Sequence, residues 1–228
     1  MHPVILITMT QDELKQFVAR EVVNYILPNE VLGLGAGSTV EHLIREIAKQ
    51  QVEVKGVVVC SDSARLVALK EGLEVFTLSQ VGRLSLYIDG ADEVDTSLCC
   101  LKGGGGAATL EKITASVSDR FICIVDESKL SSRLGKKAPV SIEVIKQARS
   151  AVSRVCVGLG GRPVYREGFV SQHGNDIIDV YDLPLSKPIA LEEKLNNIPG
   201  VVGHGLFAIL RPHSLLLASS KGIKTINQ

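Results

Sequence analysis

The chain has 228 residues, with 25 basic and 25 acidic side chains and a formal net charge of zero. Its 45% hydrophobic and 22% charged composition is that of an ordinary globular protein, with room for one large domain or for one domain with a smaller companion. This balance argues against nucleic acid or an anionic membrane as a partner, because neither would find a large basic surface. No apolar run approaches the roughly 18 residues that a membrane-spanning helix needs.

The five cysteines are odd in number, form no C-x-x-C pair and lie mostly in apolar runs. This pattern is typical of reduced, buried thiols in a cytoplasmic protein rather than of disulfides or a zinc site. Residues 3–7 (PVILI) lack the basic flank and the length of a secretory signal. We expect them to form a short apolar arm, unless translation starts at Met9.

The sequence Thr10-Gln-Asp-Glu13 predicts a capping box at the start of a helix that ends at Pro28. Lys15 lies off the apolar stripe of this helix and has the character of an exposed residue, so it is only a minor candidate for a site. A short strand and the glycine turn GLGAGST at 33–39 should follow. The next helix should bury Val40, Leu43, Ile44 and Ile47.

Strand, glycine turn and helix together form an arrangement that binds phosphate through backbone N–H groups. Ser38 replaces the third glycine of G-x-G-x-x-G, and no Gly-Lys pair occurs here, so a dinucleotide fingerprint is weak and a Walker A motif is absent. A small phosphate, held by backbone amides and by the Ser38 and Thr39 hydroxyls, fits the turn better.

Strands are expected at 52–60, 73–78, 84–88 and 121–125, with a helix from the Ser61 cap to Gly72 and another at 107–117. Strands that alternate with helices predict an α/β fold with a doubly wound, mostly parallel, Rossmann-like sheet. Ligands bind such sheets at the carboxyl ends of the strands. We therefore expect one site to gather the unusual loops at 35–39, 61–63, 89–95, 102–106 and 126–129.

The pattern changes near Leu134. A strand at 139–144, a helix with Ala148, Val152, Val155 and Leu159 inward, a hairpin around 173–175 and a helix near 189–197 predict a smaller α+β domain, inserted as a possible lid. Strands at 206–210 and 215–218 follow, and the last should return to the first sheet. The expected division is 1–134 plus 207–228 for the α/β catalytic domain and 135–206 for the smaller one.

The stretch KGGGGAATLEKI at 102–113 combines unobstructed backbone, a helix start, a cation at Lys102 and a carboxylate at Glu111. Asp89 and Asp92 belong to a second cluster, DGADEVD, directly after an apolar run. A flexible loop and a solvated acidic turn would be the simpler interpretation. The convergence of glycines, a lysine and carboxylates favours a site.

A carboxylate in such a site is a credible general base for a proton next to a carbonyl, and backbone amides with Lys102 would stabilise the enolate-like intermediate. No metal motif or Ser-His-Asp arrangement is evident, so the pattern suits a cofactor-free isomerisation of a sugar phosphate. Glu93 and Asp95 are expected to be solvated or structural, and Lys129 either a surface lysine or a phosphate ligand. Surface or turn roles are expected for the histidines, His2, His42, His173, His204 and His213.

Five motifs in this order resemble ribose-5-phosphate isomerase of the A type: GLGAGST at 33–39, SD at 61–62, DGADEVD at 89–95, KGGGGAATLEK at 102–112 and VDESK at 125–129. GLGGRPVYREG at 158–168 and PGVVGHGLF at 199–207 extend the resemblance over nearly the whole chain from Thr10.

The resemblance implies interconversion of ribose 5-phosphate and ribulose 5-phosphate through a cis-enediolate, in the non-oxidative pentose phosphate pathway. It implies a cytoplasmic homodimer or larger homo-oligomer with no metal or cofactor. By position, Glu111 matches the proton acceptor, Asp89 the acid that assists ring opening, with Asp92 beside it, and Lys102 the lysine that polarises the substrate oxygens. The matching substrate-binding residues are Ala36, Gly37, Ser38, Thr39, Asp89, Gly90, Ala91, Asp92, Lys102, Gly103, Gly104, Gly105 and Lys129.

Three positions depart from the resemblance: Ala36 stands where threonine is common, Leu110 where an arginine often precedes the glutamate, and Cys60 where serine is frequent. The first two bear on substrate binding more than on the reaction. Two alternatives remain open. One is a non-catalytic sugar-phosphate sensor of similar fold, which could lose Glu111 or Lys102. The other is a related amino-sugar-phosphate deaminase or coenzyme A transferase, although the deaminase should carry a catalytic histidine near the site.

Overall fold

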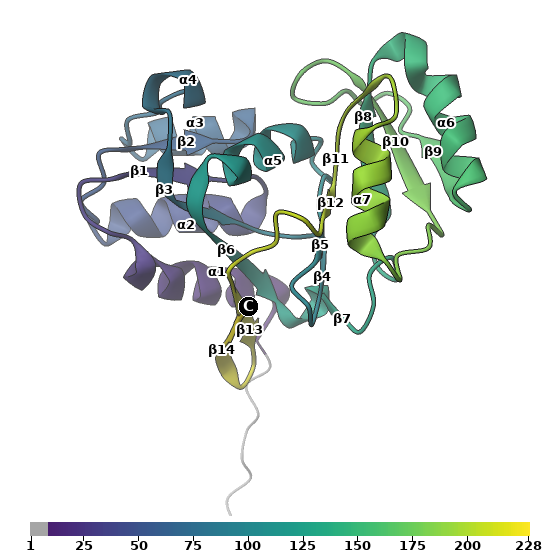
Figure 1. The fold of residues 1–228 in the computed structure, drawn as a ribbon. Coiled ribbons are helices and arrows are strands. Elements are labelled where there is room, and N and C mark those ends of the chain that lie inside the picture. Colours follow the sequence, from purple (N-terminus) through teal and green to yellow (C-terminus); the bar gives the residue numbers. More distant parts are fainter. Residues whose placement is uncertain (1–8) are drawn as a thin grey trace, which may run out of the picture.

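The computed structural model describes residues 9–228, so the apolar arm expected at 3–7 lies outside the described residues. Figure 1 shows two bodies side by side, one built on a six-stranded sheet and one on a four-stranded sheet, with a third, small sheet between them. This arrangement supports our proposed division into a catalytic domain and a smaller domain of residues 135–206.

The six-stranded sheet has the order β14-β13-β6-β3-β1-β2. All its neighbours are parallel except the edge pair of β13 and β14, which confirms a doubly wound, mostly parallel sheet. The return of the chain to this sheet through β13 is also confirmed, whereas β14 was not expected. The strands are β1 (Val31–Leu34), β2 (Gly56–Val59), β3 (Leu84–Asp89), β6 (Ser118–Asp126), β13 (Ser214–Ser219) and β14 (Gly222–Asn227).

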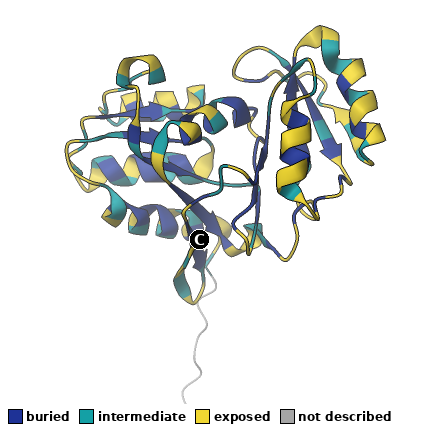
Figure 2. Cartoon of the chain, viewed as in Figure 1, coloured by how far each residue is buried: buried dark blue, intermediate teal, exposed yellow. Residues whose placement is uncertain are grey.

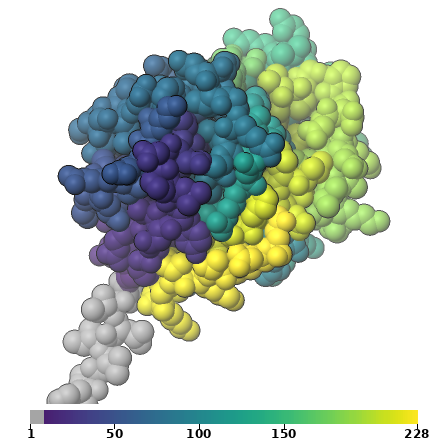
Figure 3. Space-filling view, turned by 60° about the vertical axis from the view of Figure 1, so that its left-hand side comes forward, coloured from purple at the N-terminus to yellow at the C-terminus, as the bar shows by residue number. Residues whose placement is uncertain are grey.

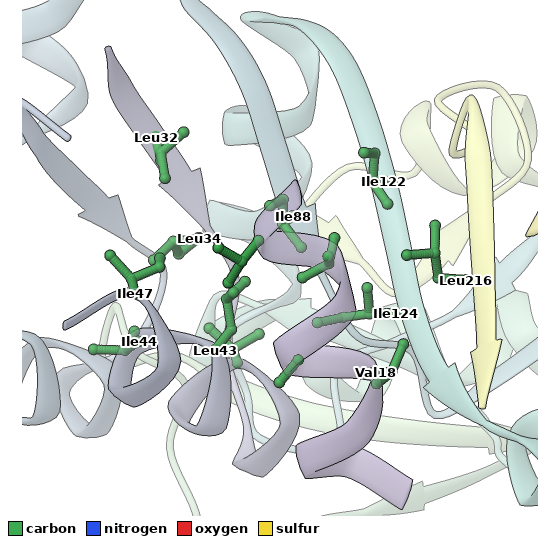
Figure 4. Close-up of a cluster of buried hydrophobic side chains, with 14 of the residues drawn as sticks. Val18, Leu32, Leu34, Leu43, Ile44, Ile47, Ile88, Ile122, Ile124 and Leu216 are labelled. Atoms are coloured by element: carbon green, nitrogen blue, oxygen red, sulfur yellow. The ribbon is translucent and has the colours of Figure 1, made fainter. Parts of the chain in front are cut away.

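Helices cover both faces of this sheet. On one face, apolar side chains of α1 and α2 pack against alternate residues of β1, β3, β6 and β13, among them Leu34, Ile88 and Ile122 (Figure 4). On the other face, α5 packs over Tyr87, Phe121 and neighbouring residues. The helices of this domain are α1 (Gln11–Val22), the 3-10 turn η1 (Val23–Tyr25), α2 (Ser38–Lys49), α3 (Asp62–Lys70), α4 (Leu78–Val81) and α5 (Ala108–Ser116).

The local signals at the helix starts are confirmed. Thr10 and Glu13 form the expected capping box of α1, and the Ser61 hydroxyl accepts the N–H of Ala64 at the start of α3. The four apolar residues expected to face inward on α2 are fully buried. In contrast, the strand expected at 73–78 is reduced to a single bridge at Val75, because a second capping box at Thr77 and Gln80 starts α4.

The four-stranded sheet has the order β11-β8-β10-β9 and is antiparallel throughout. Val140, Ile142 and Val144 point to one face, which α6 and α7 cover. Ser141 and Glu143 point to the opposite face, toward α5 and toward residues 102–106, which we call the glycine loop. The elements are β8 (Val140–Val144), the 3-10 turn η3 (Lys146–Ala148), α6 (Arg149–Gly158), β9 (Arg162–Tyr165), β10 (Asp176–Tyr181), α7 (Pro188–Asn196) and β11 (Val201–His204).

The inward stripe of α6 differs from the expected one. Val152 is buried as expected, but Val155 is 42% exposed and Cys156 takes its place in the core. Cys156 lies one helical turn after Val152 on the same face, whereas Val155 turns toward an apolar groove beside α7. The hairpin of β9 and β10 is confirmed, although its first strand ends at Tyr165 and leaves a longer loop than expected.

The small third sheet was not expected. Its strands β12 (Leu206–Phe207), β5 (Cys100–Leu101), β4 (Glu93–Asp95) and β7 (Leu130–Ser131) lie between the two larger sheets. The strand expected at 206–210 is therefore shorter and belongs to this sheet. Glu93 is fully buried, and its carboxylate accepts four backbone N–H groups, those of residues 135–138. A structural role for Glu93 agrees with this; a solvated one does not.

Figure 2 shows the burial: the strands are mostly buried, and the outer faces of α6 and α7 are exposed. Figure 3 shows the N-terminal helices and the C-terminal strands lying against each other on one face of the molecule. All five cysteines are buried and free. None of the helices in residues 9–228 is both long enough and apolar enough to cross a membrane.

Candidate active site

The candidate site lies where the strand order of the large sheet reverses. From β1 the chain continues to β2 on one side, while β3 and β6 lie on the other, so the carboxyl ends of β1 and β3 flank the switch point at which open α/β sheets bind ligands. Gly35 follows β1 and donates its N–H to the Ile88 carbonyl at 3.0 Å. A Cβ at Gly35 would lie 1.8 Å from the Asp89 carboxylate, so only glycine allows Asp89 its place.

Asp89 is fully buried at the end of β3. Its Oδ1 accepts the N–H groups of Gly90 at 2.7 Å and Ala36 at 3.2 Å. Its Oδ2 accepts the hydroxyl of Tyr87 and lies 2.6 Å from Lys102 Nζ. Burial and the neighbouring Asp89 carboxylate raise the pKa of Tyr87 well above its ordinary value, so the phenol stays a donor. Every oxygen of Asp89 is therefore held from within the protein.

Lys102 leaves β5 at the other side of the pocket. Its backbone N–H donates to the Gly205 carbonyl at 2.8 Å, which ties the loop to the strand β12 region. Its Nζ donates to the Gly90 carbonyl at 2.5 Å and contacts Asp89 and Glu111. Burial by itself lowers the pKa of Lys102, but the two carboxylates outweigh it and raise the pKa far above the ordinary value. The ammonium is charged at any physiological pH.

Glu111 lies in the first turn of α5 with 4% of its surface exposed. Its Oε2 is 3.3 Å from Lys102 Nζ but accepts no hydrogen bond from residues 9–228. Burial, and then the Asp89 charge, raise the pKa of Glu111 to about 8, although Lys102 acts in the opposite direction. A buried carboxylate with a pKa near neutrality and an unsatisfied oxygen is able to take up a proton from a bound molecule.

The glycine loop forms a tight turn in which the N–H of Gly106 donates to the Gly103 carbonyl at 3.0 Å. Gly103 and Gly106 have φ values of 102° and 72°, which glycine adopts without strain. The N–H of Gly104 donates to Asp92 Oδ2 at 2.8 Å. This bond places the Asp92 carboxylate against the loop rather than in bulk solvent.

These groups surround a pocket of about 140 Å³. Gly37, at φ 90°, opens the N-terminus of α2, where the first N–H groups have no intrahelical partner and favour an anion. Lys15 Nζ, 3.0 Å from Ser38 Oγ, and Lys129 add two cations. The lining residues are Lys15, Ala36, Gly37, Ser38, Thr39, Gly90, Ala91, Asp92, Lys102, Gly103, Gly104, Gly105, Glu111, Ile124, Val125, Asp126 and Lys129.

The pocket thus gathers four of the five expected loops. The loop at 61–63 does not line it, because β2 is the edge strand and its carboxyl end lies one strand away from the switch point; instead Asp62 binds Gln172 through its backbone N–H. Lys15 was expected to be an exposed helix residue and is found at the pocket, a placement that its position off the apolar stripe did not indicate. Tyr87, in the middle of an apolar strand, gave no signal either.

No histidine lines this pocket. His204, expected in a surface or turn role, is instead fully buried, with Nε2 2.9 Å from Asn196 Oδ1. Burial, and then the nearby Lys112 charge, keep the pKa of His204 well below its ordinary value. Within residues 9–228, no group of three or more His, Cys, Asp or Glu side chains is placed to hold a metal ion.

The sequence pattern of the ribose 5-phosphate isomerase A (phosphoriboisomerase A) family matches residues 56–222. The chain belongs to this family. A ribose-5-phosphate isomerase A of Pasteurella multocida (strain Pm70) is 41% identical over 218 residues, which cover 96% of this chain and 100% of the relative. One of Blochmanniella floridana is 42% identical over 219 residues, 96% of this chain and 99% of the relative.

The fold agrees with the family. The crystal structure of ribose 5 phosphate isomerase A from Neisseria gonorrhoeae superimposes with a TM-score of 0.94 at 41% identity, over 96% of this chain and 98% of that one. A D-ribose-5-phosphate isomerase in complex with phospho-erythronic acid superimposes with a TM-score of 0.92 at 33% identity, over 96% and 100%. The expected α/β architecture and the family resemblance are both confirmed.

The three departures from the family pattern have clear places. Ala36 contributes its backbone N–H to Asp89, a bond that does not depend on its side chain. Leu110 packs against the apolar cluster beneath α5. Cys60 is buried with Sγ 3.4 Å from Thr114 Oγ1, and burial raises the pKa of its thiol well above the ordinary value. The Cys60 thiol is therefore an inert packing group under the site.

Proposed function

We propose that the protein interconverts D-ribose 5-phosphate and D-ribulose 5-phosphate, and that Glu111 moves the proton between C2 and C1. The observation that carries this proposal is the pair formed by the buried Glu111 carboxylate and the Lys102 ammonium, 3.3 Å apart at one end of a pocket whose other end is a cationic phosphate cradle. The enzyme class follows from the family, and this geometry supports the proposed residue roles.

The phosphate of the substrate binds at the N-terminus of α2. Backbone N–H groups of residues 37–39, the hydroxyls of Ser38 and Thr39 and the ammonium groups of Lys15 and Lys129 supply donors and positive charge there. A phosphate fixed at one end leaves the aldehyde end of the open-chain sugar near Glu111. The related structure with bound phospho-erythronic acid, a phosphorylated sugar acid, supports a ligand of this kind.

Isomerisation then proceeds by proton transfer. The Glu111 carboxylate removes the proton from C2 of the aldose, and the electrons of the C–H bond form the C1–C2 double bond while negative charge develops on O1. The Lys102 ammonium and a backbone N–H group of the glycine loop stabilise this charge. Glu111 returns the proton to C1, the O2 proton moves to O1, and a ketone is left at C2. No group is consumed.

Ring opening must precede this step, because the pentose phosphate closes to a furanose. Asp89 does not line the pocket, and all its contacts are to protein groups. We therefore assign its part in ring opening to the Asp89–Lys102 pair, in which Asp89 fixes the Lys102 ammonium and this ammonium donates a hydrogen bond to the ring oxygen. As the bond between C1 and the ring oxygen breaks, the ring oxygen takes up a proton and the hydroxyl on C1 gives one up to become the aldehyde. Asp92, which does line the pocket, lies beside the same end of the sugar.

The alternative of a non-catalytic sugar-phosphate sensor is not favoured, since the chain retains both Glu111 and Lys102 at the pocket. The family also supports a place in the non-oxidative pentose phosphate pathway, a cytoplasmic location and a homodimer or larger homo-oligomer. Light scattering coupled to gel filtration tests the oligomeric state.

The deciding experiment uses purified protein that has been treated with EDTA. Incubated with ribose 5-phosphate, it should form the ketose, followed by its absorbance or by a ketose-specific colour reaction, and proton NMR in D2O should show exchange at C2. Absence of ketose with the wild-type protein, under conditions in which it is folded by circular dichroism, would overturn the proposed function.

A further inference from the structure

Arg166, from the smaller domain, contacts the backbone carbonyl groups of the glycine loop. Its Nη1 donates to the Gly103 carbonyl at 3.2 Å and to the Gly104 carbonyl at 3.0 Å. Arg166 does not line the pocket that holds Glu111; it lines a neighbouring hollow on the far side of Gly104 and Asp92. The guanidinium therefore contacts the glycine loop but is not among the residues that line the pocket.

The two carbonyls determine where the loop's donors point. The described chain has no cis peptide bond, and in a trans peptide the C=O and the N–H of the next residue point in opposite directions. A Gly103 carbonyl held by Arg166 directs the Gly104 N–H away from it, toward Asp92. A Gly104 carbonyl held by Arg166 likewise directs the Gly105 N–H away from Arg166, and Gly105 lines the pocket. Among residues 9–228, this N–H has no protein acceptor.

Arg166 is itself fixed in place. It forms a two-pronged ion pair with Asp179, Nε to Oδ2 at 2.8 Å and Nη2 to Oδ1 at 2.5 Å, and Nη2 also donates to Ser141 Oγ at 3.0 Å. The Phe169 ring lies 5.0 Å from the guanidinium carbon. The Arg166 and Asp179 side chains are only 18% and 14% exposed. A guanidinium held this tightly keeps its direction, and its charge polarises the two peptide groups it binds.

We propose that Arg166 is a positioning residue for the isomerisation: it holds the glycine loop so that the Gly105 N–H faces the reacting end of the sugar as an oxyanion donor. Asp179 holds Arg166 in turn. The role rests on the isomerase function proposed above, and it makes the smaller domain a part of the catalytic machinery. Because the phosphate cradle lies on α2, the phosphate site should be independent of Arg166.

Arg162 offers a matched control. It precedes Arg166 in the same hairpin, pairs with Asp182 at 3.1 Å and stacks on Tyr181 at 4.8 Å, but both members of its pair are exposed and it contacts no loop of the pocket. Arg166→Met and Arg162→Met thus each remove an arginine side chain and its ion pair with an aspartate in the same hairpin region, although the Arg162 pair is the more exposed. Only the first removes the contact to the glycine loop.

Steady-state kinetics on ribose 5-phosphate should separate the two variants. For Arg166→Met we expect kcat to fall about 10- to 100-fold, since small displacements of catalytic groups have effects of this order, while KM and the inhibition constant of inorganic phosphate stay within about threefold of wild type. Arg166→Lys keeps the positive charge but lacks the planar, forked set of N–H donors, so its kcat should lie between those of Arg166→Met and wild type. Guanidinium ion added to Arg166→Ala should restore turnover, and should not affect Arg162→Ala.

A kcat for Arg166→Met within threefold of wild type, or an equal loss in Arg162→Met, would overturn the proposal. So would a rise in the phosphate inhibition constant that matches the fall in kcat, because that result means general disorder of the site. If Arg166→Met does not fold, the Arg166→Lys kinetics decide. The amide resonances of Gly104 and Gly105 in 15N-labelled protein provide a readout without turnover: they should move upfield in the folded variant, and unchanged resonances count against the proposal even if the wild-type protein proves not to be an isomerase.

Discussion

Lys102 Nζ lies 3.3 Å from Glu111 Oε2, yet this oxygen accepts no hydrogen bond within residues 9–228. The ammonium instead directs its donors to Asp89 at 2.6 Å and to the Gly90 carbonyl at 2.5 Å. The Lys102 ammonium is thus near enough to favour the ionised form of Glu111, but it does not form a hydrogen bond with this carboxylate oxygen. An unsatisfied buried carboxylate destabilises the folded protein, and it is reactive toward a proton for the same reason.

Glu111→Gln should reduce turnover by roughly 10²- to 10⁴-fold, the range typical of a lost general base, while the phosphate cradle continues to bind ribose 5-phosphate. Turnover and substrate binding are measured separately, by ketose formation and by calorimetry. Glu127→Gln is the control, since Glu127 is exposed and does not line the pocket. Near-normal turnover of Glu111→Gln would remove Glu111 from the mechanism.

The pH dependence of kcat/KM should report the raised pKa of Glu111. The base must be deprotonated to act, and its pKa in the free protein is about 8. We therefore expect kcat/KM to fall about tenfold per pH unit below this value and to level off above it. A value of kcat/KM that stays constant between pH 6 and pH 9 would contradict this assignment, provided that the substrate itself does not change protonation state in that range.

Glu111→Gln should also change stability, with a sign that depends on pH. The folded protein holds a proton on Glu111 up to about pH 8, whereas an unfolded glutamate releases it near 4.5, so the wild-type protein loses stability as the pH rises between these values. The glutamine variant lacks this loss. The gain in Tm of the variant over wild type should therefore be larger at pH 8.5 than at pH 4.5. We expect this gain to grow by at least about 2–4 °C between the two pH values, the shift that roughly 1 kcal/mol produces in a chain of this size. Parallel Tm curves for the two proteins would refute the burial of an ionising Glu111.

Local signals in the sequence predicted the large sheet, except β14, and its helices, except α4, because most helix starts and apolar runs had a local physical cause. The capping box at Thr10 and the cap at Ser61 are examples. The third sheet escaped prediction, because β4, β5, β7 and β12 have only two or three residues each and their pairing is set by tertiary contacts. No periodicity is detectable in so short a strand.

The same limit applies to the site. Glycines and charged residues after strands indicated the loops, and the order of strands decided which loops meet. The exclusion of 61–63 follows from the edge position of β2, which no local pattern reveals. Tyr87 acts through one hydrogen bond, to a residue two positions away, and Arg166 through two, to residues 62 and 63 positions away. None of these contacts leaves a pattern in the chain.

Lys102→Met should be far less active and less stable. Removal of the ammonium leaves Asp89 and Glu111 buried without a cation, and breaking a buried ion pair on one side costs roughly 3–5 kcal/mol. The loss of a cationic donor to the developing oxyanion should lower kcat by about 10²- to 10³-fold. Any residual activity should have its pH profile displaced to higher pH, because Lys102 lowers the pKa of Glu111. Urea denaturation tests the predicted loss of stability, and residual kcat/KM measured across pH tests the predicted loss of activity. An unchanged rate would leave Lys102 a structural role only.

Gly35→Ala tests the support beneath Asp89. The added methyl would lie 1.8 Å from the Asp89 carboxylate, so Asp89 has to move and Lys102 loses its nearest counter-ion. We expect a loss of about 1–3 kcal/mol in the free energy of unfolding, as for other overpacked sites, and a much larger relative loss of turnover. Gly158→Ala is the control, since nothing lies within 4 Å of a Cβ there and alanine suits the end of α6. If Gly35→Ala keeps wild-type turnover while Gly158→Ala is also neutral, the fixed position of Asp89 is not needed for the reaction, and the Asp89–Lys102 pair loses its proposed part in ring opening.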